Sequence, residues 1–160
     1  VLTLAGEGWT RVLAEISRQF QDASIFMSDE QAARFGRGRP WFYRYDRSIY
    51  DDATEELWAL DRNTPLRDIH RTPPGIVVDR VSLISDADLD RSPVGRHFLV
   101  RGDIHHMLLT VPQRDDQRVG VLWVGRSRYA PAFDSRERRR LRALSTHVGG
   151  VTCSPEHPSV

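Results

Sequence analysis

The sequence predicts an α+β domain, in which helices flank an antiparallel sheet. Three observations lead to this fold class. Helical patterns occur near both ends of the chain, over about residues 8–21 and 133–148. Strand patterns follow the first helix, at 24–28 and 41–46. Two strongly apolar strands, 104–111 and 118–126, come just before the last helix and are joined by a short polar loop, which predicts an antiparallel pair.

The first helix is predicted from one apolar stripe along its sequence. The members of this stripe are three or four residues apart, as one face of a helix requires: Trp9, Val12, Leu13, Ile16 and Phe20. A short strand follows over 24–28. The glycines and the proline of residues 34–40 then indicate a turn.

The next strand, 41–46, is predicted from its aromatic residues. Side chains alternate along a strand, so Trp41, Tyr43 and Tyr45 are expected on one face. Asp51 is expected to cap a helix over about 52–61. This helix would place three apolar side chains near the core: Leu57, Trp58 and Leu60.

The middle of the chain, 63–77, contains three prolines and a glycine and is expected to be irregular. A loop of this length inside a compact domain is usually functional or poorly ordered. Short extended pieces are expected at 76–78 and 81–84. Ser85 and Asp88 have capping-box spacing and predict a short helix near 86–91, with a further helical turn at 94–99.

The last third has clearer patterns. Strands 104–111 and 118–126 are apolar on both faces, which favours the middle of a covered sheet. Asp134 and Glu137 have capping-box spacing at the start of the last helix. Its apolar stripe continues through Leu141, Leu144 and Val148, and residues 149–150, both glycine, are expected to end it. Residues 1–150 are thus predicted as a single domain, and 151–160 as a disordered tail or the start of a linker.

Composition excludes several classes of protein. The chain has 160 residues, enough for one domain with a real core, and a net charge of +1, too small for a free-standing nucleic-acid binder. Its single cysteine, Cys153, excludes a disulfide framework and a cysteine-based zinc site. No signal peptide and no membrane-spanning apolar run occur, so a cytoplasmic location without membrane contact is expected.

The second half of the chain resembles a known family. The relevant segments are 81–86 (VSLISD), 92–98 (SPVGRHF), 121–126 (VLWVGR), 133–137 (FDSRE) and 141–148 (LRALSTHV). Together they resemble the GAF-like sensor region found upstream of the helix-turn-helix in LuxR-type bacterial transcription regulators. The resemblance extends over about residues 8–150. It implies a GAF/PAS-like fold, a small-molecule or regulatory input, and dimerisation through terminal helices. No helix-turn-helix follows residue 150, so DNA contact is expected only through a C-terminal domain that this sequence lacks.

A ligand pocket is predicted where aromatic and histidine side chains gather. Ligand pockets are mostly apolar and aromatic, with a few polar groups. In GAF-like domains the ligand usually lies on one side of the sheet, and segment 62–80 is expected to cover it. The predicted ligand-binding residues are Trp41, Tyr43, Tyr45, Trp58, His70, His105, Met107 and Trp123. The predicted partners are a small organic ligand and a second copy of the chain, bound through the first and last helices.

Catalysis is the alternative hypothesis. The sequence has no nucleophile elbow, zinc-protease, dinucleotide or phosphate-loop motif. A stand-alone enzyme on the same fold would therefore rely on His105, His106 or His70 as a general acid or base. His105 and His106 are adjacent in a strand and should point to opposite faces, so they cannot bind one metal together. No metal and no cofactor are predicted. A protein-interaction module without a ligand is a third possibility.

Overall fold

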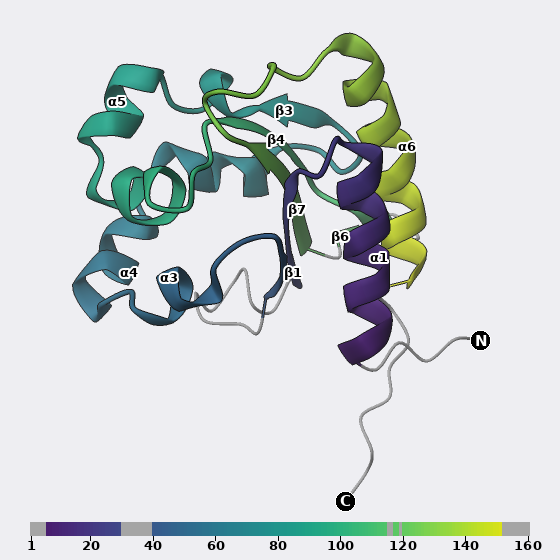
Figure 1. Ribbon diagram of the computed structural model, residues 1–160, viewed down its shortest axis with the longest axis horizontal. Coiled ribbons are helices and arrows are strands. Elements are labelled where there is room, and N and C mark those ends of the chain that lie inside the picture. The colour runs from purple at the N-terminus through teal and green to yellow at the C-terminus, as the bar shows by residue number, and fades with distance from the viewer. Residues whose placement is uncertain (1–5, 30–39, 115–116, 119, 152–160) are drawn as a thin grey trace, which may run out of the picture.

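Helices cover both faces of one antiparallel sheet (Figure 1) in the computed structural model, which describes residues 6–29, 40–114, 117–118 and 120–151. Within these residues the sheet has five strands in the order β2-β1-β7-β4-β3, and every neighbouring pair is antiparallel. The strands are β1 (Ser24–Asp29), β2 (Trp41–Tyr43), β3 (Val77–Asp79), β4 (His106–Thr110) and β7 (Gly120–Arg126). The α+β class predicted from the sequence is confirmed.

The predicted pair of apolar strands forms the centre of the sheet. β7 lies between β1 and β4, and two short strands, β5 (Gln113–Arg114) and β6 (Gln117–Arg118), extend the connection between β4 and β7. The register places Trp123 opposite Phe26 on one side and opposite Leu109 on the other. Because paired residues share a face, these side chains form one row across the sheet.

Two long helices lie side by side on one face of the sheet, α1 (Gly6–Gln19) and α6 (Ser135–Val151) (Figure 1). The predicted apolar stripes form the core beneath them: Leu13 of α1, Phe20 just after α1 and Leu141 of α6 are at most 1% exposed. They pack with Ile25 and Val124 of the sheet. The stripes of both helices are therefore covered within a single copy of the chain.

Helix α6 begins as the sequence predicts. The Asp134 carboxylate accepts a hydrogen bond from the Glu137 N–H at 2.8 Å, and the Glu137 carboxylate accepts one from the Asp134 N–H at 3.0 Å. The predicted helix end is wrong, because α6 continues through residues 149–150 to Val151. The tail 152–160 and the predicted turn at 34–39 lie outside the described residues.

Short helices cover the other face. They are α3 (Arg47–Asp51), α4 (Glu55–Asp61), the 3₁₀ helices η1 (Pro65–Arg71) and η2 (Arg80–Ser82), α5 (Asp86–Arg91) and the π-helical turn η3 (Gly95–Val100). A second core forms between these helices and the sheet, and its buried members include Ile69, Leu89, Leu99, Met107 and Leu109. The sheet thus separates two cores.

The helix predicted at 52–61 forms over 55–61 as α4, and Thr54, not the predicted Asp51, caps it through the Leu57 N–H at 3.2 Å. A separate helix that the sequence did not predict, α3, precedes it at 47–51. Asp46 caps α3, since its carboxylate accepts from the Ser48 N–H at 2.9 Å. Of the three apolar residues expected near the core, Trp58 is buried and Leu57 is half-buried. The third, Leu60, is 44% exposed.

The middle of the chain has more regular structure than predicted. The 3₁₀ helix η1 occupies about half of the segment expected to be irregular, and η2 begins a helical turn at 80–82 where an extended piece was expected at 81–84. The capping box at Ser85 is confirmed, since its hydroxyl accepts from the Asp88 N–H at 3.1 Å. The helical turn expected near 94–99 is also confirmed.

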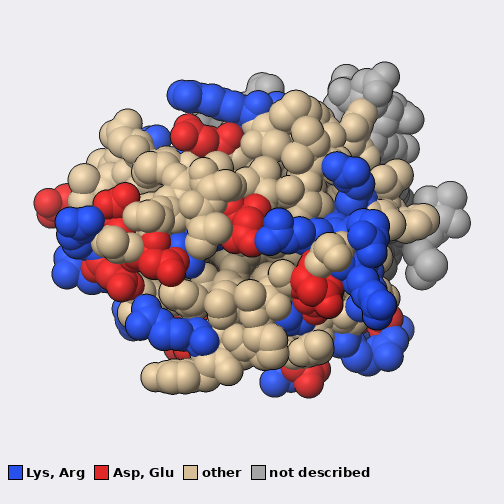
Figure 2. All heavy atoms as spheres, turned by 90° about the horizontal axis from the view of Figure 1, so that it is seen from above, with Lys and Arg blue, Asp and Glu red and all other residues tan. Residues whose placement is uncertain are grey.

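The surface over α6 is rich in arginine. Figure 2 shows basic side chains gathered on the right, the side on which α6 lies in Figure 1. Two arginines of α6 have partners in the fold: Arg138 pairs with Asp79 at 2.8 Å, and Arg140 donates to the Gln19 carbonyl at 2.7 Å. Across the described ranges, none of the helices has the length and apolar character needed to cross a membrane.

Candidate functional site

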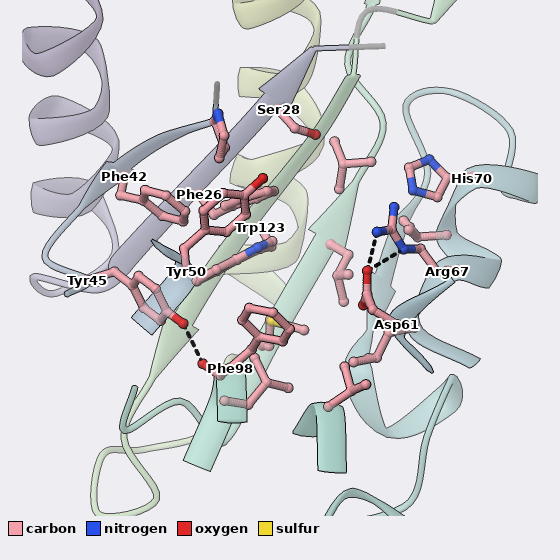
Figure 3. A pocket seen from close by; sticks show the side chains of 18 of the residues that line it. Phe26, Ser28, Phe42, Tyr45, Tyr50, Asp61, Arg67, His70, Phe98 and Trp123 are labelled. Atoms are coloured by element: carbon pink, nitrogen blue, oxygen red, sulfur yellow. Dashed lines mark hydrogen bonds and ion pairs between the residues drawn. The ribbon is translucent and has the colours of Figure 1, made fainter. Parts of the chain in front are cut away.

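A cavity of about 160 Å³ lies between the sheet and the short helices (Figure 3). The sheet contributes side chains from four strands: Phe26 and Ser28 from β1, Phe42 from β2, Met107 and Leu109 from β4, and Val121 and Trp123 from β7. The helical layer contributes Tyr50 from α3, Trp58 and Asp61 from α4, Leu66, Arg67, Ile69 and His70 from η1, and Phe98 and Leu99 from η3. The cavity is therefore built from segments far apart in the sequence.

Strand alternation explains which sheet residues reach the cavity. On β1, Phe26 and Ser28 face it, whereas Ile25 and Met27 belong to the core under the long helices. The same alternation holds on β4 and β7. These strands are covered on both faces, and every second side chain along each of them lines the cavity.

Seven aromatic rings line the cavity in a continuous set, named here the aromatic wall: Phe26, Phe42, Tyr45, Tyr50, Trp58, Phe98 and Trp123. Phe26 stacks on Trp123 with centroids 5.2 Å apart and planes 11° apart. Tyr50 meets Trp58 edge-on at 4.8 Å, and Trp58 meets Phe98 at 5.2 Å. The aromatic wall therefore continues from the sheet into the helical layer.

Tyr45 is fixed in the aromatic wall by its hydroxyl. That hydroxyl donates to the Phe98 carbonyl at 2.7 Å (Figure 3). Burial raises the pKa of Tyr45 well above its ordinary value, and burial also raises the pKa of Tyr50. Both phenols therefore stay neutral at physiological pH, and Tyr45 ties the end of β2 to η3.

One ion pair lies opposite the aromatic wall. Arg67 donates from Nε to Asp61 Oδ2 at 3.0 Å, and a second nitrogen of the same guanidinium contacts the same oxygen. The two side chains are 25% and 14% exposed. Figure 3 shows this pair beside His70, across the cavity from Trp123 and Phe26. The cavity thus combines a large apolar surface with one neutralised polar end.

Five of the eight predicted ligand-binding residues line the cavity: Tyr45, Trp58, His70, Met107 and Trp123. Segment 62–80, expected to cover the site, contributes η1 to the lining. The remaining three, Trp41, Tyr43 and His105, lie elsewhere.

The expectation that Trp41, Tyr43 and Tyr45 share a face is wrong. Arg44 has a φ of 54°, in the left-handed region, which ends β2 after Tyr43. Trp41 and Tyr43 consequently pack on the core under the long helices, where Trp41 stacks on Trp9 at 5.0 Å. Tyr45 passes to the opposite side of the sheet and joins the cavity lining.

His105 lies outside the cavity, beside a buried arginine. Arg80 is 1% exposed and donates to the His105 carbonyl at 2.8 Å and to Asp86 at 2.7 Å. The His105 ring is 3.8 Å from Asp86, and burial lowers its pKa against the opposing effect of that carboxylate. The ring meets that of His106 edge-on at 4.9 Å, so the two adjacent histidines do not point fully apart.

Of the three histidines considered for catalysis, only His70 lines the cavity. His105 precedes β4 and His106 begins it, and neither is among the lining residues. In the part of the chain that the structure describes, no three His, Cys, Asp or Glu side chains are grouped to hold a metal ion.

Sequence reasoning missed seven lining residues on which the site depends: Phe26, Ser28, Phe42, Tyr50, Asp61, Arg67 and Phe98. Alternation in the predicted strand 24–28 places Phe26 and Ser28 on one face, so that signal was available. No local pattern links Asp61 to Arg67, because their pairing depends on the turn between α4 and η1.

Comparisons with known proteins give one result on the fold. No protein-family model matches the sequence, and no curated protein sequence matches it. Among solved structures, the chain is similar to the crystal structure of Escherichia coli SdiA, with a TM-score of 0.53 and 11% sequence identity. The similarity covers 99% of this chain and 68% of the SdiA chain. At this identity the likeness extends to the fold alone.

Proposed function

We propose that this domain senses a small organic molecule, which binds in the cavity beside the aromatic wall and regulates an output elsewhere in the protein. The observation that carries the proposal is the cavity itself: an aromatic-lined space on one sheet face, with a few polar groups at one end. Pockets with this composition are typical of small-molecule sites.

The fold supports a regulatory role for this binding. SdiA is a LuxR-type regulator, and this chain has a similar fold. The domain is therefore the input part of a bacterial transcription regulator in this proposal, located in the cytoplasm. The DNA-binding part of such a regulator would lie outside these 160 residues.

A homodimer through α1 and α6 belongs to the same proposal. Because the apolar stripes of both helices are buried against the sheet, the dimer would use their outer faces. On α6 those faces carry exposed arginines, including Arg136, Arg139 and Arg142.

Filling the cavity tests the proposal. Val121 is 5% exposed and lines the cavity, so Val121→Phe places a ring where the ligand would lie. In a thermal-shift screen of small organic compounds, we expect some to raise the Tm of the wild type by about 5 °C at saturation. The same compounds should not raise the Tm of Val121→Phe.

Val81→Phe is the matched control, because Val81 is 54% exposed and does not line the cavity. This variant should respond like the wild type. Because the cavity leaves room for an added ring, the Val121→Phe substitution carries less risk of overpacking than one in a closed core. Leu109→Phe fills the same cavity from β4 and is an independent check. Compounds that stabilise the wild type and both filled variants equally would contradict the proposed site.

A further inference from the structure

We infer that the ligand is an uncharged aromatic molecule of one or two rings, carrying a polar group with both a hydrogen-bond donor and an acceptor. This inference rests on the proposed sensing function and specifies the chemical class that the cavity selects. Size, ring geometry, charge and the polar groups of the lining each contribute one step.

Size limits the ligand to a small ring system. The cavity volume is about 160 Å³. An engineered protein cavity of about 150 Å³ takes up benzene. A single ring with a substituent fits such a space.

Ring geometry favours an aromatic body over a saturated one. The aromatic wall holds stacked and edge-on ring pairs together, as in the stack of Phe26 on Trp123 and the edge contact of Tyr45 on Trp123 at 5.8 Å. Aromatic pairs in these arrangements gain energy beyond the area that they bury. A flat unsaturated ring therefore gains more here than a saturated ring of equal size.

Charge at the polar end favours a neutral ligand. Asp61 and Arg67 are the acidic and the basic side chain that line the polar end beside His70, and they neutralise each other. An anion would meet Asp61 and a cation would meet Arg67, so neither finds a free counter-ion. Burying an uncompensated charge is costly, which disfavours both.

Polar groups inside the cavity call for a donor and an acceptor on the ligand. Ser28 lines the cavity with its hydroxyl-bearing side chain, and the residue is 6% exposed. Trp123 also lines the cavity and carries an indole N–H, and Figure 3 shows both side chains there. A hydroxyl donates and accepts, whereas an indole N–H only donates. An amide-like group satisfies both.

A ring-matched series of probes tests this class on the wild-type protein at pH 7. Benzamide has the neutral donor–acceptor group, benzoate is its anionic counterpart and benzylammonium its cationic one. Cyclohexanecarboxamide keeps the amide on a saturated ring. By ligand-observed saturation-transfer NMR titration, benzamide should bind about tenfold more tightly than either ion, because the charged groups are desolvated without compensation. It should also bind more tightly than cyclohexanecarboxamide.

Two charge variants provide a readout that a general loss of stability cannot mimic. Asp61→Asn leaves Arg67 as the net charge, so the affinity ratio of benzoate to benzamide should rise. Arg67→Gln leaves Asp61, so the ratio of benzylammonium to benzamide should rise instead. The ratio of two affinities measured on one sample does not depend on the fraction of protein that is folded. The double variant should keep the wild-type preference for benzamide.

The outcomes separate this inference from the proposed function. Equal or tighter binding of either ion or of cyclohexanecarboxamide to the wild type overturns the class, as does the failure of all four probes to bind. If compounds of another class stabilise the wild type but not Val121→Phe, the sensing function stands and the ligand class is wrong. If no compound distinguishes these two proteins, the sensing function itself fails.

Discussion

At the scale of single residues, the buried ion pair of Arg126 and Glu137 connects the sheet to the long helices α1 and α6. Arg126 ends β7 and is 5% exposed. Its guanidinium donates to the Phe20 carbonyl at 2.9 Å, binds the Glu137 carboxylate and lies 4.1 Å above the Phe133 ring. Glu137 also accepts from the N–H at the start of α6. The end of α1, the end of β7 and the start of α6 thus meet at one arginine.

We expect Glu137→Ala to lower the free energy of unfolding by about 3–5 kcal/mol, because it leaves Arg126 buried without its counter-charge. Glu137→Gln keeps an acceptor for the helix cap and should cost less. Arg138→Ala is the control on the same helix: its ion pair with Asp79 is about half exposed on the arginine side, so its loss should cost less than about 1 kcal/mol. Urea denaturation gives all three values. Equal losses in Glu137→Ala and Arg138→Ala would contradict the role of the buried pair.

At the scale of elements, the sequence predicted those whose signals are local. Two capping boxes, at Ser85 and at Asp134, marked helix starts that the structure has, and apolar alternation marked the central strands. The prediction of elements failed where the feature that ends or forms an element has no local sequence pattern. Arg44 takes a left-handed conformation although it is not glycine, and α3 has only five residues, too few to show a helical period.

A close approach of two helical elements is testable at Gly95, where η3 begins beside α5. A Cβ on this residue would lie 2.6 Å from the Leu89 carbonyl oxygen and 2.7 Å from its Cδ1. Since backbone must move to relieve that contact, Gly95→Ala should destabilise the domain by about 1–3 kcal/mol. Val100→Ala, 48% exposed on the same turn, should stay within about 0.5 kcal/mol of the wild type. Denaturant titration compares them, and equal values would rule out tight packing at this crossing.

At the scale of the whole molecule, the sheet carries two different cores on its two faces. The core beneath α1 and α6 is closed, whereas the core under the short helices contains the cavity. Five of the eight expected ligand residues line the cavity, where aromatic side chains gather. Sequence reasoning could not assemble the complete site, because the lining comes from four strands and four short helices whose packing no local pattern encodes.

The tryptophans report on the two cores separately. Trp9 and Trp41 belong to the core beneath the long helices, and Trp58 and Trp123 line the cavity. β1, β4 and β7 contribute side chains to both cores, so neither core can unfold while the other stays intact. We therefore expect a single cooperative transition.

Two double variants test this cooperativity. Trp58→Phe with Trp123→Phe leaves fluorescence only from the closed core, and Trp9→Phe with Trp41→Phe leaves it only from the cavity side. In each variant, the urea midpoint from fluorescence should coincide with the midpoint from far-UV circular dichroism, which reports mainly the long helices. A lower midpoint for the cavity-side fluorescence alone would mean that the short helices open as a separate unit. Ligand binding would then stabilise that layer by itself, and occupancy of the cavity would not be communicated through the sheet to α6.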